Sequence, residues 1–234
     1  MSEQILTYEL RDGVAVLIMD DGRANALGPA MIAELNAALD RAGQEAKAVL
    51  IIGRPQRFCA GFDLKVMASG LENVRSLVTS GAELMLRMYT HPLPIVAACT
   101  GHALAAGALL LLAADSRIGA EGDFKIGLPE VAIHMTLPIF ALELARDRIA
   151  RNRLSEAATQ ARIYTPDEAA QIGFLDETVS ADVLIETAFA RAAALGALPQ
   201  PAFRNTKRKE REATVRLIRD TLEQDSRSFD GAAS

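Results

Sequence analysis

The stretch from Pro94 to Asp115 constrains what this chain can fold into more than any other segment. Residues 95–99 are apolar or small, follow a proline and end at Thr100-Gly101, which is typical of a short, fully buried strand. Residues 108–114 are apolar on every side and predict a core helix. A small-residue turn between them offers free N–H groups at the start of a helix. Two interpretations stay open from this stretch alone: half of an oxyanion hole, or plain packing of a core helix.

Charge and composition exclude several classes of protein. The net charge of −5 argues against sequence-independent binding to nucleic acid or to an anionic membrane, although a local cluster of Lys and Arg can still hold an anion. The apolar run 103–114 is shorter than the roughly 20 residues that a membrane-spanning helix needs. The two cysteines, Cys59 and Cys99, lack metal-ligand spacing, so we expect reduced buried thiols and no metal site. Without a signal-peptide pattern at its start, the chain is expected to be cytoplasmic.

The order of the predicted elements indicates an α/β fold with a parallel sheet, followed by a helical end. Strands are expected over 6–10 and 14–20 as a hairpin, and over 48–52, 95–99, 116–120 and 124–126. Helices are expected over 29–45, 71–89, 108–114, 155–161, 166–172, 181–195 and 210–229, with shorter ones starting at Pro129 and Pro138. Residues 53–63 are expected to form a loop.

Three short blocks of the sequence resemble the signature blocks of the crotonase (enoyl-CoA hydratase/isomerase) superfamily. They are Phe58–Lys65, Thr100–Gly107 and Ile126–Glu130, and the loop Arg23–Leu27 is similar to the segment of that family that contacts coenzyme A. Residues 164–176 resemble the helix pair that follows the family's core. The resemblance runs in the correct order along nearly the whole chain. It implies a crotonase-like spiral of ββα units over residues 1–178, with a helical C-terminal region over 179–234 that packs on the core or on a neighbouring subunit. It also implies a homotrimer or a dimer of trimers.

The same resemblance implies an acyl-CoA thioester substrate, with coenzyme A as part of the substrate and no separate cofactor. The backbone N–H groups of Phe62 and Ala106 would hold the thioester oxygen, where negative charge develops when the α-proton leaves. Gly61 would allow the close approach of the backbone, or it is an ordinary turn glycine. The positions implied to contact substrate are Arg23, Ala24, Ala60, Gly61, Asp63, Leu64, Lys65, Gly107, Leu109 and His134.

The acid/base groups distinguish the reactions of the family. Its hydratases resemble one another in having two glutamates, and here the first position is Leu109 while the second is Glu130. Moving a double bond needs only one base, which takes a proton from C2 and returns it to C4. The single-glutamate pattern is similar to that of Δ3,Δ2-enoyl-CoA isomerases, so we expect isomerisation with Glu130 as the base. Enclosure by Leu128, Val131 and Ile133 is expected to raise its pKa. A helix-start glutamate that stabilises the dipole is the alternative.

Other readings of the sequence stay open. The chain is alternatively an enoyl-CoA hydratase, or a catalytically silent acyl-CoA-binding subunit. His134 is a wall of the acyl pocket, a second acid/base group or a structural residue, and His91 is expected at the surface. Met67, Leu71, Met85 and Met135 are candidates for setting the depth of the acyl pocket.

Cations for the phosphates of coenzyme A are expected in two places. Arg23, Arg57 and Lys65 lie near the first blocks, and Lys207-Arg208-Lys209 with Arg211 precedes the last predicted helix. The second group is either a solvated face or a ligand-binding group that acts in a neighbouring subunit. The last helix carries an apolar stripe of Val215, Ile218, Leu222 and Phe229, which needs an apolar partner.

Overall fold

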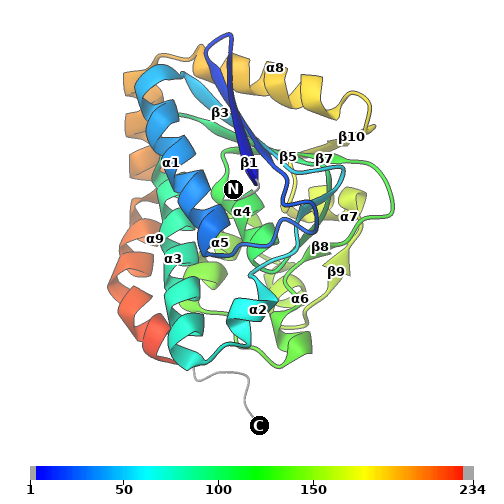
Figure 1. Ribbon diagram of the computed structural model, residues 1–234, viewed down its shortest axis with the longest axis vertical. Helices are drawn as coiled ribbons and strands as arrows, with labels where there is room; N and C mark the ends of the chain where they lie inside the picture. The colour runs from blue at the N-terminus through cyan, green and yellow to red at the C-terminus, as the bar shows by residue number, and fades with distance from the viewer. Residues whose placement is uncertain (1–3, 229–234) are drawn as a thin grey trace.

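Two β-sheets carry the fold, and from the third strand to the eighth, successive strands alternate between them (Figure 1). The computed structural model describes residues 4–228. The larger sheet has the order β1-β2-β3-β5-β7-β10, in which β1 and β2 form an antiparallel hairpin and the remaining neighbours are parallel. The smaller sheet has the order β4-β6-β8-β9. The strands of the larger sheet are β1 (Leu6–Arg11), β2 (Val14–Met19), β3 (Ala48–Ile52), β5 (Ile95–Cys99), β7 (Ser116–Ala120) and β10 (Glu177–Val179). Those of the smaller sheet are β4 (Gln56–Cys59), β6 (Gly101–Leu104), β8 (Ile126–Gly127) and β9 (Ile163–Tyr164).

Helices cover both faces of the larger sheet (Figure 1). They are α1 (Pro29–Glu45), α2 (Leu64–Met67), α3 (Leu71–Thr90), α4 (Ala106–Ala113), a 3₁₀ turn η1 (Glu130–Ile133), α5 (Ile139–Arg148), α6 (Leu154–Ala158), α7 (Pro166–Ile172), α8 (Leu184–Gly196) and α9 (Gln200–Ser228). The unit of a strand in each sheet followed by a helix recurs along the chain, which is the expected α/β spiral of ββα units. No helix of the described residues is long and apolar enough to cross a membrane.

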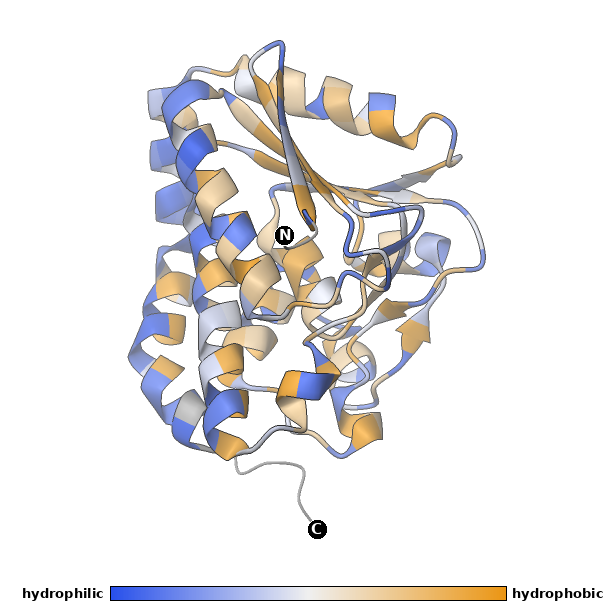
Figure 2. Cartoon of the chain, viewed as in Figure 1, coloured by the Kyte–Doolittle hydropathy of each residue, from blue (hydrophilic) through white to orange (hydrophobic). Residues whose placement is uncertain are grey.

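The alternation of side chains along the strands divides the apolar interior into two layers. On β2, Val14 and Val16 point to the layer that α8 covers, whereas Ala15, Leu17 and Met19 point to the main core with α1, α3 and α4. The central strands therefore bury both faces, which explains why β3 and β5 are continuous apolar runs. Figure 2 shows the same arrangement, with hydrophobic strands at the centre and the hydrophilic residues of α9 on the outside.

Most predicted elements are confirmed, and four strands, β4, β6, β9 and β10, were not predicted. The hairpin, α1, β3, β5, β7 and α7 lie where the sequence predicts them, to within a residue at the ends. Residues 53–63, expected as a loop, contain β4, and the predicted turn after Thr100 contains β6. These two strands pair with each other in the smaller sheet. The chain therefore passes through the smaller sheet between β3 and β5, and again between β5 and β7, before it returns to the larger sheet.

Helix α9 packs on its own chain, along α3 and α5 (Figure 1). It begins at Gln200, ten residues before the predicted start at Glu210. Ile218 is buried, and Val215 and Leu222 pack against the main core, as the apolar stripe predicts. Phe229 and the rest of the predicted region to 234 lie outside the described residues. The boundary predicted at residue 178 falls within β10.

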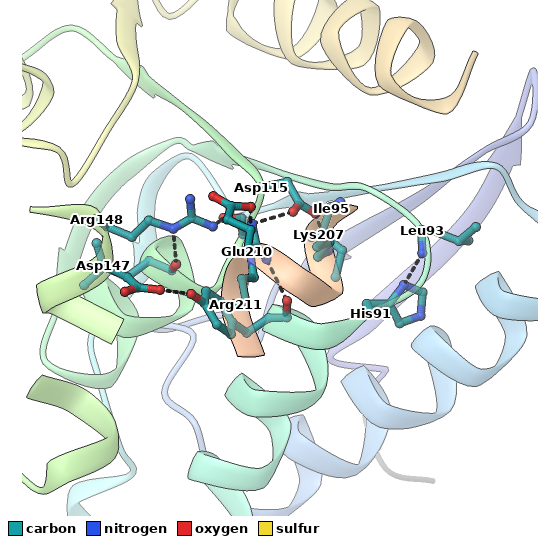
Figure 3. A network of polar contacts seen from close by, with 12 residues as sticks. His91, Leu93, Ile95, Asp115, Asp147, Arg148, Lys207, Glu210 and Arg211 are labelled. Atoms are coloured by element: carbon teal, nitrogen blue, oxygen red, sulfur yellow. Dashed lines mark hydrogen bonds and ion pairs between the residues drawn. The ribbon is translucent and has the colours of Figure 1, made fainter. Parts of the chain in front are cut away.

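The basic run at the start of α9 is partly internal, which corrects the expectation of a solvated or ligand-binding face (Figure 3). Lys207 and Arg211 are buried, and their side chains pair with the two oxygens of Asp115 at 2.7 and 2.8 Å. Arg211 also donates to the Tyr89 carbonyl at 2.6 Å. Burial lowers the pKa of Lys207 to about 8, while Asp115 acts in the opposite direction. These two cations therefore hold α9 on the core, and only Arg208 and Lys209 of the run are exposed.

His91 belongs to the same region and was also wrongly expected at the surface. It is 5% exposed, and its Nδ1 accepts a hydrogen bond from the Leu93 N–H at 3.3 Å (Figure 3). Burial is the main cause of its lowered pKa, and the nearby Lys207 adds to the effect. Its position next to Pro92 suggested an exposed loop, but His91 is buried with Lys207 of α9 nearby.

Candidate active site

The turn between β6 and α4 places backbone N–H groups at the start of a buried helix. Ala105 has a left-handed φ of +50°, and its N–H donates to the Gly127 carbonyl of β8 at 3.0 Å. Helix α4 then begins at Ala106, whose N–H has no acceptor among the described residues. A positive φ at a residue other than glycine costs free energy and is retained where the surroundings impose it. Here the pairing with β8 imposes it, and the Ala106 N–H is left available to a ligand.

A second loop meets this turn from the other side. The Leu27 N–H donates to the Gly61 carbonyl at 2.8 Å and the Asp63 N–H donates to the Leu27 carbonyl at 3.1 Å. These two bonds use the groups on either side of Phe62, whose own N–H, facing the other way, has no acceptor within residues 4–228. Gly61 has φ +105°, and a Cβ on it would stand 3.7 Å from the Ala106 nitrogen. The loop and the helix start are therefore in contact, and their function as two halves of one oxyanion hole stays a prediction.

The ring of Phe62 is seated on helix α3. A Cβ at Gly81 would come within 2.4 Å of the ring carbon Cε1, so only glycine at that position lets the ring lie where it does. On the following residue, the Asp63 carboxylate accepts the Lys65 N–H at 2.8 Å and caps α2. Both contacts fix the backbone around Phe62 and with it the direction of its N–H.

An apolar cavity of about 150 Å³ opens at this meeting point. It is lined by Ala60, Phe62, Leu64, Met67, Val78, Leu104, Ala105, Leu109, Pro129, Glu130, Ile133, Met135, Thr136, Pro138 and Phe140. Val78, Leu109 and Phe140 are buried and form its closed end. Leu64 and Ile133 are 78% and 51% exposed, so they lie at its mouth.

Glu130 is the single ionisable side chain among the described residues that line this cavity. It is the first residue of η1, and it reaches the cavity because β8 pairs with β6 just before it. The residue is 8% exposed, and its Oε2 has no hydrogen-bond partner among the described residues. Burial raises its pKa to about 7. A carboxyl group in this state accepts and releases a proton near neutral pH, as a general base must.

The structure brings together most, but not all, of the predicted site residues. Ala60, Phe62, Leu64 and Leu109 line the cavity together with Glu130. Ala106, Gly61 and Gly107 are buried directly behind its wall, where Gly107 packs against the Cys59 carbonyl. Arg23, Ala24, Asp63 and Lys65 are not in the lining; the Ala24 carbonyl accepts the Ala60 N–H at 3.0 Å, which ties the two loops together.

His134 lies apart from the cavity. It is exposed, takes a left-handed φ of +61° at the end of η1, and lines a different hollow on the outer surface. The enclosure of Glu130 also differs from expectation, since Leu128 is buried but Val131 is 47% exposed. Glu130 instead shares the lining of the cavity with buried residues outside its own turn, among them Val78 and Phe140.

Some residues of the site were not predicted from the sequence. Val78 and Phe140 close the cavity, and of the four candidates for its depth only Met67 and Met135 line it. Asn25 is fully buried, and its side chain donates to the carbonyls of Met19 and Phe58 at 2.8 and 3.2 Å. It thereby joins the loop after β2 to β4. An asparagine between two alanines was the available signal in the sequence, because asparagine tolerates a positive φ, here +51°, better than most residues.

Comparison with known proteins gives a consistent result. The family model described as enoyl-CoA hydratase/isomerase matches residues 9–233. A probable enoyl-CoA hydratase of Rhodobacter capsulatus is 36% identical over 89% of this chain and 81% of that protein. The crystal structure of an enoyl-CoA hydratase/isomerase family protein from Pseudomonas syringae is 42% identical and covers 96% of this chain and 97% of its own, with a TM-score of 0.93. A protein of Mycobacterium tuberculosis, described as an enoyl-CoA isomerase in one structure and as a probable enoyl-CoA hydratase in another, is 37% identical; the first structure covers 98% of this chain and 100% of its own, also with a TM-score of 0.93.

Proposed function

Because the chain belongs to the enoyl-CoA hydratase/isomerase family, we propose that it isomerises 3-enoyl-CoA thioesters to 2-enoyl-CoA with Glu130 as its one base. The observation that carries this proposal is the content of the cavity, where Glu130 is the only ionisable side chain of the described lining and Leu109 takes the place of a second acid. Addition of water by a pair of carboxyl groups needs a second acid, and the one other polar side chain of the described lining, that of Thr136, is a hydroxyl. Isomerisation needs a single base.

The proposed mechanism uses one proton and two backbone donors. The Glu130 carboxylate takes a proton from C2, and the electrons of that C–H bond move towards the thioester carbonyl, which becomes an enolate oxygen. The N–H groups of Phe62 and Ala106 donate to that oxygen and stabilise the charge as it forms; loss of one such donor typically costs about 10²–10³-fold in kcat. Glu130 then returns the proton to C4, and the double bond moves from C3–C4 to C2–C3.

The charged part of the substrate is assigned to the exposed cations beside the cavity. The side chains of Arg23 and Lys65 are exposed, and neither makes an ion pair with another described residue. Arg23 lies in the loop after β2 and Lys65 lies in the first turn of α2, just after Phe62 and Asp63, so we assign both to the phosphates of coenzyme A. The homotrimer or dimer of trimers and the cytoplasmic location stay predictions from the sequence.

Replacement of Glu130 tests the function. Purified Glu130→Gln is expected to lose kcat for 3-hexenoyl-CoA by about 10³-fold or more, because the amide takes up no proton. Formation of 2-enoyl-CoA is followed by its ultraviolet absorbance. Glu72→Gln removes the same charge from the exposed first turn of α3 and is the matched control, with unchanged kcat expected. Thermal melting of both variants checks that they are folded.

Two outcomes would replace the proposal. Hydration of 2-hexenoyl-CoA that survives Glu130→Gln would show that the base was wrongly assigned and would favour a hydratase. Tight binding of acyl-CoA without turnover of either enoyl ester would favour a catalytically silent binding subunit.

A further inference from the structure

The cavity beside Glu130 is separated from a second hollow by a single turn of chain. The hollow measures about 370 Å³ and is lined by Val131, His134, Met135, Thr136, Leu137, Leu142, Ala158 and Thr159. Met135 and Thr136 belong to both linings. The left-handed turn at His134 sends the backbone between the two spaces, and the Met135 N–H donates to the Glu130 carbonyl at 2.9 Å. The segment that separates the two spaces is thus hydrogen-bonded to Glu130, the proposed base.

The size of the inner cavity limits what it can enclose. A cavity of about 150 Å³ holds a molecule the size of benzene, that is, about six carbon atoms. Its closed end consists of buried residues, Val78, Leu109 and Phe140, which belong to the main core and cannot give way without repacking. On the side of the outer hollow the barrier is the half-buried Met135, an unbranched and flexible side chain.

We propose that this protein acts on short-chain acyl-CoA thioesters of up to about six acyl carbons, and that Met135 sets this limit by closing the cavity towards the outer hollow. The proposal rests on the acyl-CoA site of the proposed function and adds to it the length of the acyl chain. A longer chain has its distal carbons stopped at Met135. Removal of that side chain joins the two spaces and gives the distal carbons an apolar surface that includes Leu137 and Leu142.

Binding of saturated acyl-CoA esters tests this limit separately from catalysis, because these esters have no double bond to move. Affinities of butanoyl-, hexanoyl- and decanoyl-CoA are measured by isothermal titration calorimetry. In the wild type, affinity rises by up to about fourfold per methylene as far as hexanoyl-CoA, and by less than about threefold in total from there to decanoyl-CoA. In Met135→Ala the gain in affinity from hexanoyl-CoA to decanoyl-CoA becomes larger than about tenfold, since four further methylenes are buried.

Two further variants show where the distal carbons go. In Met135→Ala/Leu142→Trp the indole fills the outer hollow, and the preference for decanoyl-CoA is expected to return to the wild-type value. Leu142→Ala, which enlarges the outer hollow behind an intact Met135, is the matched control and keeps the wild-type chain-length profile.

Three results would overturn the inference: decanoyl-CoA bound by the wild type more than about tenfold tighter than hexanoyl-CoA, a wild-type profile in folded Met135→Ala, or no binding of any of the three esters. If the protein shows this binding profile but does not isomerise 3-enoyl-CoA, the proposed reaction is wrong and the limit on acyl-chain length still holds.

Discussion

At the scale of single residues, the site depends on a carboxyl group held in an apolar place. Burial raises the pKa of Glu130 to about 7, so the native state favours the protonated form. The sign of the effect on stability follows: its contribution is fully present below the unfolded pKa near 4.5 and is lost as pH rises through 7. The loss corresponds to about 3 kcal/mol. The chain thus gives up stability at neutral pH to hold a base that works there.

The raised pKa of Glu130 predicts the pH dependence of the reaction. The base must be ionised to take the proton from C2, so kcat/KM for 3-hexenoyl-CoA is expected to rise about tenfold per pH unit below about 7 and to level off above it. Initial rates between pH 5 and 9 measure the profile. The residual rate of Glu130→Gln should lack this rise. A wild-type profile that is flat down to pH 5 would contradict the raised pKa.

Single residues also show what sequence patterns can and cannot predict. Phe62, Ala106 and Glu130 were selected from short local blocks of the sequence. The structure places Phe62 and Glu130 in the lining of one cavity, and Ala106 directly follows the lining residue Ala105. Their catalytic roles stay predictions. The burial of Lys207 and Arg211 was not predictable in this way, because their partner Asp115 lies about a hundred residues away and a basic run on its own indicates a solvated face.

At the scale of elements, helix α5 is capped by a residue from the far end of the chain. The α5 amides of Ile139 and Phe140 donate to the two carboxylate oxygens of Asp225 at 2.9 and 3.1 Å. Pro138, at the N-cap position, has no side chain that can do so. Because Pro138 and Phe140 line the cavity, α9 fixes one of its walls.

Loss of this cap is expected to weaken the fold. Asp225→Ala should lower the free energy of unfolding by about 1–3 kcal/mol, since two buried N–H groups lose their acceptor, and Asp225→Asn, which keeps one acceptor oxygen, by less. Urea denaturation measures the change. Asp220→Ala, an exposed acid on the same helix, is the control and should change stability by less than about 0.5 kcal/mol. Equal effects of Asp225→Ala and Asp220→Ala would contradict the capping role.

Two of the strands that were not predicted share one property. β4 and β6 have no apolar alternation of their own: the first two residues of β4 are exposed, and β6 mixes glycine and histidine with apolar residues. They form strands because they pair with each other. The periodicity of a single segment does not reveal such pairing between segments. β3 and β5 were predictable because a strand covered on both faces must be apolar throughout.

At the scale of the whole molecule, α9 is joined to the core by charges as well as by apolar contacts. Asp115 stands between β5 and β7, and it accepts hydrogen bonds from the Ile95 N–H, Lys207 and Arg211. Tyr89 and Thr214 donate to Asp147 in the same region. The C-terminal helix is therefore a part of this subunit's core. The α/β class and the helical end were predictable from the order of elements, whereas the helix's place in the subunit depended on the Asp115 contacts.

Neutralising Asp115 is expected to loosen this attachment. Asp115→Asn leaves two buried cations without a counter-charge and should lower the free energy of unfolding by about 3–5 kcal/mol. Glu223→Gln, which breaks the exposed pair with Arg227, should cost less than about 1 kcal/mol. Chemical denaturation followed by circular dichroism compares the two. If they prove equal, apolar contacts alone hold α9.

The seat of the Phe62 ring on Gly81 has a consequence for how this chain can change over time. Because Gly81 has no side chain, the Phe62 ring has room to lie against α3. The position of the ring in turn fixes the Phe62 N–H that we assign to the thioester oxygen. Neither position can drift alone: a larger residue in the middle of α3 is tolerated only alongside a smaller one in the loop. We therefore expect positions 62 and 81 to change together in evolution, although they are nineteen positions apart in the sequence.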